Sequence, residues 1–206
     1  MKTRSIAAGA LALAAVGTGF ASASSAGASG PHTSFTMQRS PGIVAARCLP
    51  QAKARVTVTH DGPVERMRIQ AWGLAKNTDF DTFVIQVPNA PFGVSWYQGD
   101  LESNGLGKAD VEYVGRFSQE TFAIAPGVAP APSVHSTPTP DATTNPAFGP
   151  VHTFHVGIWF NNPADALKAG CPGATTPFNG EHNAGVQVLN TGSFADTDGP
   201  LGRFRP

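Results

Sequence analysis

The feature of this sequence that most constrains its fold is a regular alternation of apolar and polar residues between Phe80 and Phe117. A period of two places apolar side chains on one face of a strand and polar side chains on the other. The first segment alternates through Phe83, Ile85 and Val87, and the last through Val111, Tyr113 and Phe117 with Asp110, Glu112 and Arg116 between them. The last pattern is typical of a half-buried antiparallel strand. Asn104-Gly105, before this last strand, predicts a tight turn.

Strand periodicity recurs along the chain and decides the fold class. It is present in residues 43–48, 55–59, 64–72, 121–125, 151–160 and 184–190. Residues 162–170 predict a short helix, because Asn162 and Pro163 precede good helix formers and Gly170 ends them. About nine strands and one short helix predict an all-β fold, an antiparallel β-sandwich of immunoglobulin-like or jelly-roll type.

The N-terminus has the pattern of a cleaved signal peptide, with Lys2 and Arg4, an apolar run and Ala21-Ser22-Ala23. We expect residues 1–23 to be removed and the protein to be secreted and extracellular. No later segment is apolar enough to predict a membrane span. Residues 24–41 are expected to be a flexible lead-in, and residues 42–206 a single domain. Within it, residues 126–150, rich in Pro, Ser and Thr, predict a mobile excursion.

Charge and cysteine content limit the partners and the compartment. The expected mature chain of 183 residues has 12 basic and 14 acidic side chains, a net charge near −2 that gives no reason to expect nucleic acid. Cys48 and Cys171 are the only two cysteines. An even count outside the cell predicts that they form a disulfide.

Two resemblances to known families extend the prediction. The spacing of Leu74, Thr78 and Phe80 resembles the Leu-x-Pro-x-Thr-x-Tyr corner of fibronectin type III-like domains, with Lys76 at the proline position and Phe80 without the tyrosine hydroxyl. The segments FVIQVPNAPFGVSWYQGDL and GEHNAGVQVLNT resemble those of secreted proteins of high-GC Gram-positive bacteria. The second resemblance implies secretion and a β-sandwich fold, and it implies no particular activity.

Candidate metal ligands are few. His155 and, in a later loop, Glu181 and His182 are residue types that bind copper or zinc. Asp100, Glu102 and Asn104 have the alternate spacing of a calcium loop, but Val111 stands where such a loop needs a bidentate Glu. A polar turn is the simpler interpretation. We therefore expect no cofactor, and copper, zinc and calcium stay open as alternatives.

Phe92, Trp96 and Tyr97 lie in a segment bounded by Gly and Pro and are candidates for an aromatic platform that binds carbohydrate. Packing in the core is the alternative. Adjacent strand residues point to opposite faces, so we expect one of Trp96 and Tyr97 to be buried and the other to point outward, with Tyr97 or Gln98 exposed near a loop.

The functional hypothesis rests on strong strand patterning without a complete catalytic constellation, such as Gly-x-Ser-x-Gly. It is a secreted, non-enzymatic binding or structural module for an unknown extracellular ligand, with cell-wall polysaccharide a candidate. The alternative is a secreted enzyme. That enzyme would be metal-dependent through His155, Glu181 and His182, or carboxylate-based through the acidic residues Glu102, Asp110, Glu112 and Glu120.

Overall fold

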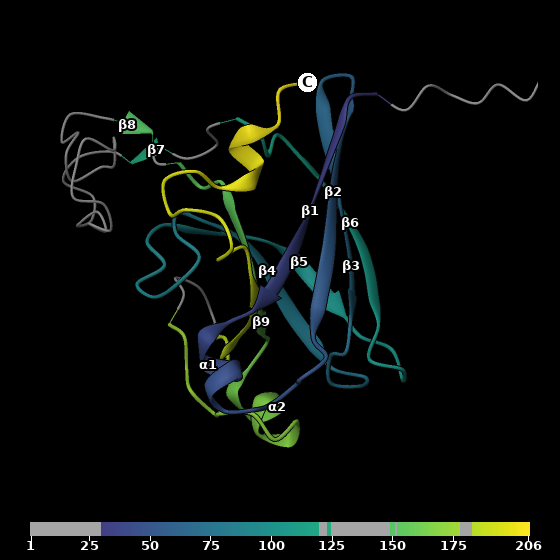
Figure 1. The fold of residues 1–206 in the computed structure, drawn as a ribbon, viewed down its shortest axis with the longest axis vertical. Coiled ribbons are helices and arrows are strands. Elements are labelled where there is room, and N and C mark those ends of the chain that lie inside the picture. Colours follow the sequence, from purple (N-terminus) through teal and green to yellow (C-terminus); the bar gives the residue numbers. More distant parts are fainter. Residues whose placement is uncertain (1–29, 120–122, 125–148, 151, 178–182) are drawn as a thin grey trace, which may run out of the picture.

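The computed structural model describes residues 30–119, 123–124, 149–150, 152–177 and 183–206 of the chain. Within these residues eight antiparallel strands form one sheet (Figure 1). From edge to edge they are β5 (Ser95–Glu102), β4 (Asp79–Ile85), β9 (His155–Phe160), β10 (Gln187–Asn190), β1 (His32–Arg39), β2 (Lys53–Asp61), β3 (Val64–Trp72) and β6 (Ala109–Gly115). The predicted all-β antiparallel class is confirmed.

Strand β1 joins the two halves of this sheet. Residues 32–37 of β1 pair with β2, while Gln38 and Arg39 pair with β10. The halves enclose one main hydrophobic core to which both contribute. Its fully buried side chains include Val56, Met67, Ile69, Phe80, Ile158 and Phe160. The finer prediction of an immunoglobulin-like or jelly-roll sandwich stays a prediction.

The prediction of a flexible lead-in over residues 24–41 is wrong for the residues that form β1. Phe35 and Met37 are buried in the main core while their neighbours Ser34 and Thr36 face solvent. The Ser and Thr content that indicated flexibility is therefore the polar face of an ordered strand, because hydroxyl side chains are well tolerated on a solvated sheet surface.

The predicted strand over residues 43–48 is also wrong, because this segment contains the helix α1 (Pro41–Ala45). Ser40 is its N-cap, with Oγ 3.5 Å from the backbone nitrogen of Ile43, and Pro41 occupies the first turn. A capping Ser followed by Pro is a helix start signal, and here it outweighs the apolar alternation. The described chain thus has two short α-helices and not one.

The one predicted helix, over residues 162–170, is confirmed as α2 (Pro163–Lys168), capped by Asn162 and followed by Gly170 at φ 74°. The predicted disulfide is confirmed as well. Cys48 and Cys171 are bonded with 5.3 Å between their Cα atoms, and the bond links the chain after α1 to the chain after α2. Both helices lie at the same end of the molecule (Figure 1). The opposite end carries the 3-10 helix η1 (Pro200–Arg203).

The strands β5 and β6 follow each other in the chain but do not pair in the sheet, since β6 pairs with β3. The turn between them has its left-handed residue at Gly107 (φ 68°), where an added Cβ would lie 2.4 Å from the carbonyl oxygen of Leu74. The Leu74 nitrogen donates to the carbonyl oxygen of Gly107 at 3.1 Å. This turn is therefore attached to the corner that follows β3, which directs β6 onto β3.

Several predictions about segment boundaries fall outside the described residues. Residues 1–23, the predicted signal peptide, and residues 125–148, most of the predicted excursion, are among them. The short strands β7 (Ala123–Ile124) and β8 (Gly149–Pro150) pair with each other on either side of that segment. Among the described residues, no helix is long and apolar enough to cross a membrane.

Candidate functional site

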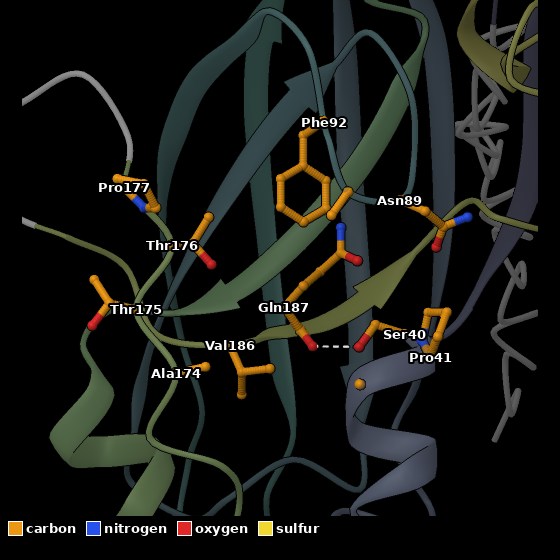
Figure 2. Close-up of a pocket in the computed structure, with 12 residues that line it drawn as sticks. Ser40, Pro41, Asn89, Phe92, Ala174, Thr175, Thr176, Pro177, Val186 and Gln187 are labelled. Carbon is orange, nitrogen blue, oxygen red and sulfur yellow. Dashed lines mark hydrogen bonds between the residues drawn. The ribbon is translucent and has the colours of Figure 1, made fainter. Parts of the chain in front are cut away.

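A cleft of about 530 Å³ lies beside β10 and is the candidate binding site (Figure 2). Three segments far apart in the sequence form its walls: the start of α1, the loop that follows β4, and the segment between α2 and β10. The lining residues are Ser40, Pro41, Gly42, Asn89, Ala90, Phe92, Ala174, Thr175, Thr176, Pro177, Val186 and Gln187.

The first wall is the N-terminal end of α1, which is fixed to β10 through Ser40. Its Oγ donates to the carbonyl oxygen of Gln187 at 2.5 Å, and its backbone nitrogen donates to the carbonyl oxygen of Val188 at 2.9 Å. Ser40 is 2% exposed. The helix start therefore cannot move away from the strand without leaving buried polar groups unpaired.

The second wall is the loop of residues 88–92. The Val87 nitrogen donates to the Phe92 carbonyl oxygen at 3.1 Å, which closes the loop. The Phe92 ring packs edge to face on Trp159 of β9, with 5.0 Å between ring centroids and 84° between planes. This contact belongs to a second apolar cluster with Phe83 and Ile85. One face of β4 thus supports the loop that follows it.

The third wall is the segment of residues 174–177. The Thr176 nitrogen donates to the Ala184 carbonyl oxygen at 2.8 Å, and the Thr176 Oγ1 donates to the Gly185 carbonyl oxygen at 2.9 Å. Ala174 and Thr175, next to Thr176, are exposed. Ala174 lies three positions after Cys171, so the disulfide anchors this wall close to Cys48, just after the C-terminal end of α1.

The chemistry of the cleft is neutral in the part that the structure describes. None of its twelve lining residues has a side chain that titrates or carries charge; they offer hydroxyls, amides, small apolar groups and one aromatic ring. Such a site has hydrogen-bond donors and acceptors to orient a ligand and an apolar ring to cover it. These lining groups include no general acid or base.

The structure separates the three predicted platform residues. Phe92 lines the cleft, whereas Trp96 lies beside a smaller hollow of about 190 Å³ near Val114. Tyr97 packs on Phe83 and donates from its hydroxyl to Asp100 Oδ1 at 2.5 Å. Partial burial and the hydrogen bond to Asp100 raise the pKa of Tyr97 above the usual range for tyrosine.

The expectation that one of Trp96 and Tyr97 is buried is wrong, because they are 54% and 47% exposed. They lie at the start of β5, an edge strand that pairs with β4 only, so no strand paired on its other side covers them. The prediction that Tyr97 or Gln98 is exposed is confirmed for Tyr97.

His155, the one described residue of the predicted metal site, is 1% exposed in β9. Its Nε2 lies 3.2 Å from the carbonyl oxygens of Ala195 and Asp196, so it carries a proton and donates; its Nδ1 lies 2.9 Å from Thr191 Oγ1. Glu181 and His182 lie outside the described residues, and their convergence with His155 stays a prediction. Residues within the described ranges contain no group of three or more His, Cys, Asp or Glu placed to hold a metal.

Two of the acidic residues named for a carboxylate-based enzyme, Asp110 and Glu112, form ion pairs with arginines. Asp110 Oδ2 accepts from Arg68 Nη2 at 2.5 Å, and Glu112 Oε1 accepts from Arg66 Nη1 at 2.9 Å, across the outer face of β3 and β6. The hydrogen bond from Arg68 lowers the pKa of Asp110. These carboxylates belong to a solvated ion-pair ladder. Glu120, the last residue of that set, is outside the described ranges.

The possible calcium loop is a turn stabilised by its own side chain. Asn104 Oδ1 accepts from the backbone nitrogens of Leu106 at 2.9 Å and Lys108 at 3.2 Å. This oxygen is turned toward the backbone, as the polar-turn interpretation requires.

Of the residues that line the cleft, only Phe92 is predicted from the sequence as a binding residue. Residues 88–91, with two prolines, were visible only as the end of a strand, and Thr175 and Thr176 only as part of a polar loop. The one local signal was Ser40-Pro41, a cap that predicts where α1 begins. The meeting of three distant segments at β10 has no local signature. The chain matches no protein-family model, no curated protein and no solved structure.

Proposed function

We propose that the protein is a secreted, non-enzymatic binding module whose cleft takes an uncharged sugar unit of an extracellular or cell-wall polysaccharide. The observation that carries the proposal is the neutral lining of the cleft: hydroxyls and amides beside the ring of Phe92. The Cys48–Cys171 disulfide is in keeping with an oxidising compartment, where such bonds persist.

A sugar suits this lining for two reasons. Its hydroxyls exchange hydrogen bonds with neutral partners such as the exposed Asn89 and Thr175, and its ring C–H face packs on an aromatic side chain such as Phe92. A charged ligand would lose hydration in the cleft without meeting an opposite charge among the described lining residues. The geometry therefore favours neutral polysaccharides over anionic ones.

The test is titration calorimetry of the full mature chain with the neutral hexasaccharides cellohexaose, laminarihexaose, mannohexaose and chitohexaose, and with anionic hexagalacturonate. We expect at least one neutral sugar to bind and hexagalacturonate not to bind. The variant Ala174→Glu places bulk and charge at an exposed lining position and should abolish binding. The matched control, Ala164→Glu, changes an exposed alanine in the first turn of α2, outside the cleft, and should bind like the wild type.

The variant Tyr97→Ala decides between the cleft and the aromatic residues of β5, because Tyr97 is exposed and does not line the cleft. We expect it to bind like the wild type. Loss of binding in Tyr97→Ala with normal binding in Ala174→Glu would place the site on β5 and refute the cleft. Failure of the wild type to bind any neutral sugar, or tighter binding of hexagalacturonate, would contradict the proposed function.

A further inference from the structure

The side chain of Asn190 lies under the cleft and does not line it. Asn190 is the last residue of β10 and is fully buried. Its Nδ2 lies within hydrogen-bonding distance of three acceptors: the Pro88 carbonyl oxygen at 3.0 Å, Asn89 Oδ1 at 3.1 Å and Gln187 Oε1 at 2.9 Å. Its Oδ1 accepts from the Gly192 nitrogen at 3.0 Å. The side chain therefore uses both its donor and its acceptor groups.

Gln187 completes this network from the floor of the cleft. Its Nε2 donates to the Pro88 carbonyl oxygen at 3.1 Å, and its backbone carbonyl accepts from Ser40 Oγ. Gln187 is 5% exposed. The loop wall and the α1 wall are thus both hydrogen-bonded to the same residue of β10.

We infer that Asn190 and Gln187 are positioning residues that hold the loop of residues 88–92 in its binding shape before a ligand arrives. This inference rests on the proposed function. The loop contributes Asn89, Ala90 and Phe92 to the cleft. A loop that is ordered in advance lowers the entropy cost of binding, so a change at Asn190 weakens binding without removing a ligand contact.

The most direct variant is Asn190→Asp, which keeps the size of the side chain and replaces the donor Nδ2 with an oxygen. At neutral pH that oxygen faces two acceptors of the loop, the Pro88 carbonyl oxygen and Asn89 Oδ1, and a third acceptor, Gln187 Oε1. Because an oxygen without a proton cannot donate to them, the loop should detach. Burial among acceptors favours the protonated acid, which donates one hydrogen bond. The variant should therefore recover when the pH is lowered from 7.5 to 4.5.

Other titrating groups must be separated from this effect. The partners of the Asn190 side chain are amides and backbone groups, and its strand neighbours Gln38 and Gly157 do not titrate. One titratable side chain, His155, contacts Thr191, the residue that follows Asn190. The wild type and the control Asn104→Asp are therefore measured at both pH values. Asn104 uses only its acceptor oxygen in the turn before β6, so Asp preserves its contacts.

The first readout needs no ligand: hydrogen exchange of the loop amides, Val87 and Val94 in particular, relative to wild type at the same pH. These two residues flank the loop of residues 88–92: the Val87 nitrogen donates to the Phe92 carbonyl oxygen and the Val94 nitrogen donates to Gln86 Oε1. We expect Asn190→Asp to exchange roughly tenfold faster or more at pH 7.5 and close to wild type at pH 4.5. Exchange like that of the wild type at both pH values would overturn the inference.

The second readout is affinity for the neutral hexasaccharide that the wild type binds. We expect a loss of about tenfold or more in Asn190→Asp at pH 7.5, because fewer molecules hold the competent loop, and recovery at pH 4.5. Faster loop exchange with unchanged affinity would refute the positioning role and leave the proposed function intact. If the wild type binds no sugar, the proposed function fails and the loop exchange alone decides whether the network orders the loop.

A charged residue at this position can also prevent folding at pH 7.5. The variant Asn190→Leu then takes its place, because it has similar volume and no charge. We expect fast loop exchange and weak binding at both pH values, without recovery in acid. Slow exchange and normal affinity in Asn190→Leu would overturn the inference.

Discussion

Tyr113 is a single side chain that connects the two edges of the sheet. Its hydroxyl, on β6, lies 2.9 Å from Thr82 Oγ1 and 3.0 Å from the carbonyl oxygen of Asp100 on β5. Burial is the main cause that raises the pKa of Tyr113 to about 12 from its ordinary value of 10. The folded state therefore holds the phenolic proton more tightly than the unfolded chain.

The pKa of Tyr113 is higher in the folded state than in the unfolded chain. Its contribution to the unfolding free energy is therefore fully present below pH 10 and is lost as the pH rises through about 12. We expect Tyr113→Phe to lower the unfolding free energy by about 1 kcal/mol at pH 8, through the lost hydrogen bonds. The difference in unfolding free energy between Tyr113→Phe and the wild type should disappear between pH 10 and 12. Urea unfolding at several pH values measures this, and a constant difference would contradict the account.

The protein has two tyrosines, so absorbance at 295 nm in Tyr97→Phe reports on Tyr113 alone. A titration midpoint near pH 10 would show that Tyr113 is not buried as described.

At the residue scale, the sequence predicts which side chains of a strand share a face and not which faces are covered. Tyr113 and Phe117 are buried and Glu112 is exposed, as the alternation requires. Trp96 and Tyr97 break the expectation because burial depends on the neighbouring strands, and β5 is paired with β4 only.

At the scale of elements, α1 depends on Ser40 both for its cap and for its attachment to β10. We expect Ser40→Ala to lower the unfolding free energy by about 1 to 2 kcal/mol, because a cap is lost and the Gln187 carbonyl loses a donor. Chemical denaturation measures the change. Ser34→Ala, on the exposed face of β1, is the control and should have a much smaller effect. Equal effects would show that α1 is not fixed in this way.

The disulfide gives a second prediction for these elements. It closes a loop with a sequence separation of 123 residues, and in the chain-entropy model the double variant Cys48→Ala with Cys171→Ala loses at most about 5 kcal/mol. Thermal unfolding of the double variant and of the wild type measures this loss of stability. Unchanged stability would mean that the bond does not restrict the unfolded chain.

Local signals explain which elements the sequence could predict. The β2–β3 hairpin was predictable because the turn at Gly62 (φ 63°) lies between two alternating segments, and α2 because its cap, proline and final glycine all agree. The pairing of β6 with β3 was not predictable. It depends on the contact between Gly107 and Leu74, which are distant in sequence.

At the scale of the whole molecule, the fold class follows from strand periodicity while the candidate site does not. The cleft exists because α1, the loop after β4 and the segment after α2 are all attached to β10 and the residues just before it. Each attachment joins parts of the chain that show no common pattern. Neither the neutral character of the cleft nor the role of Asn190 can therefore be read from any one segment.

We propose that a neutral sugar binds in the cleft beside β10, and NMR chemical-shift mapping with the tightest-binding hexasaccharide is the decisive measurement. We predict that the largest shifts occur at Asn89, Phe92, Thr175 and Thr176, which line the cleft. The amides of Trp96 and Tyr97 should change little. Shifts concentrated at Trp96 and Tyr97, or saturating sugar with no shift in the cleft, would contradict the account.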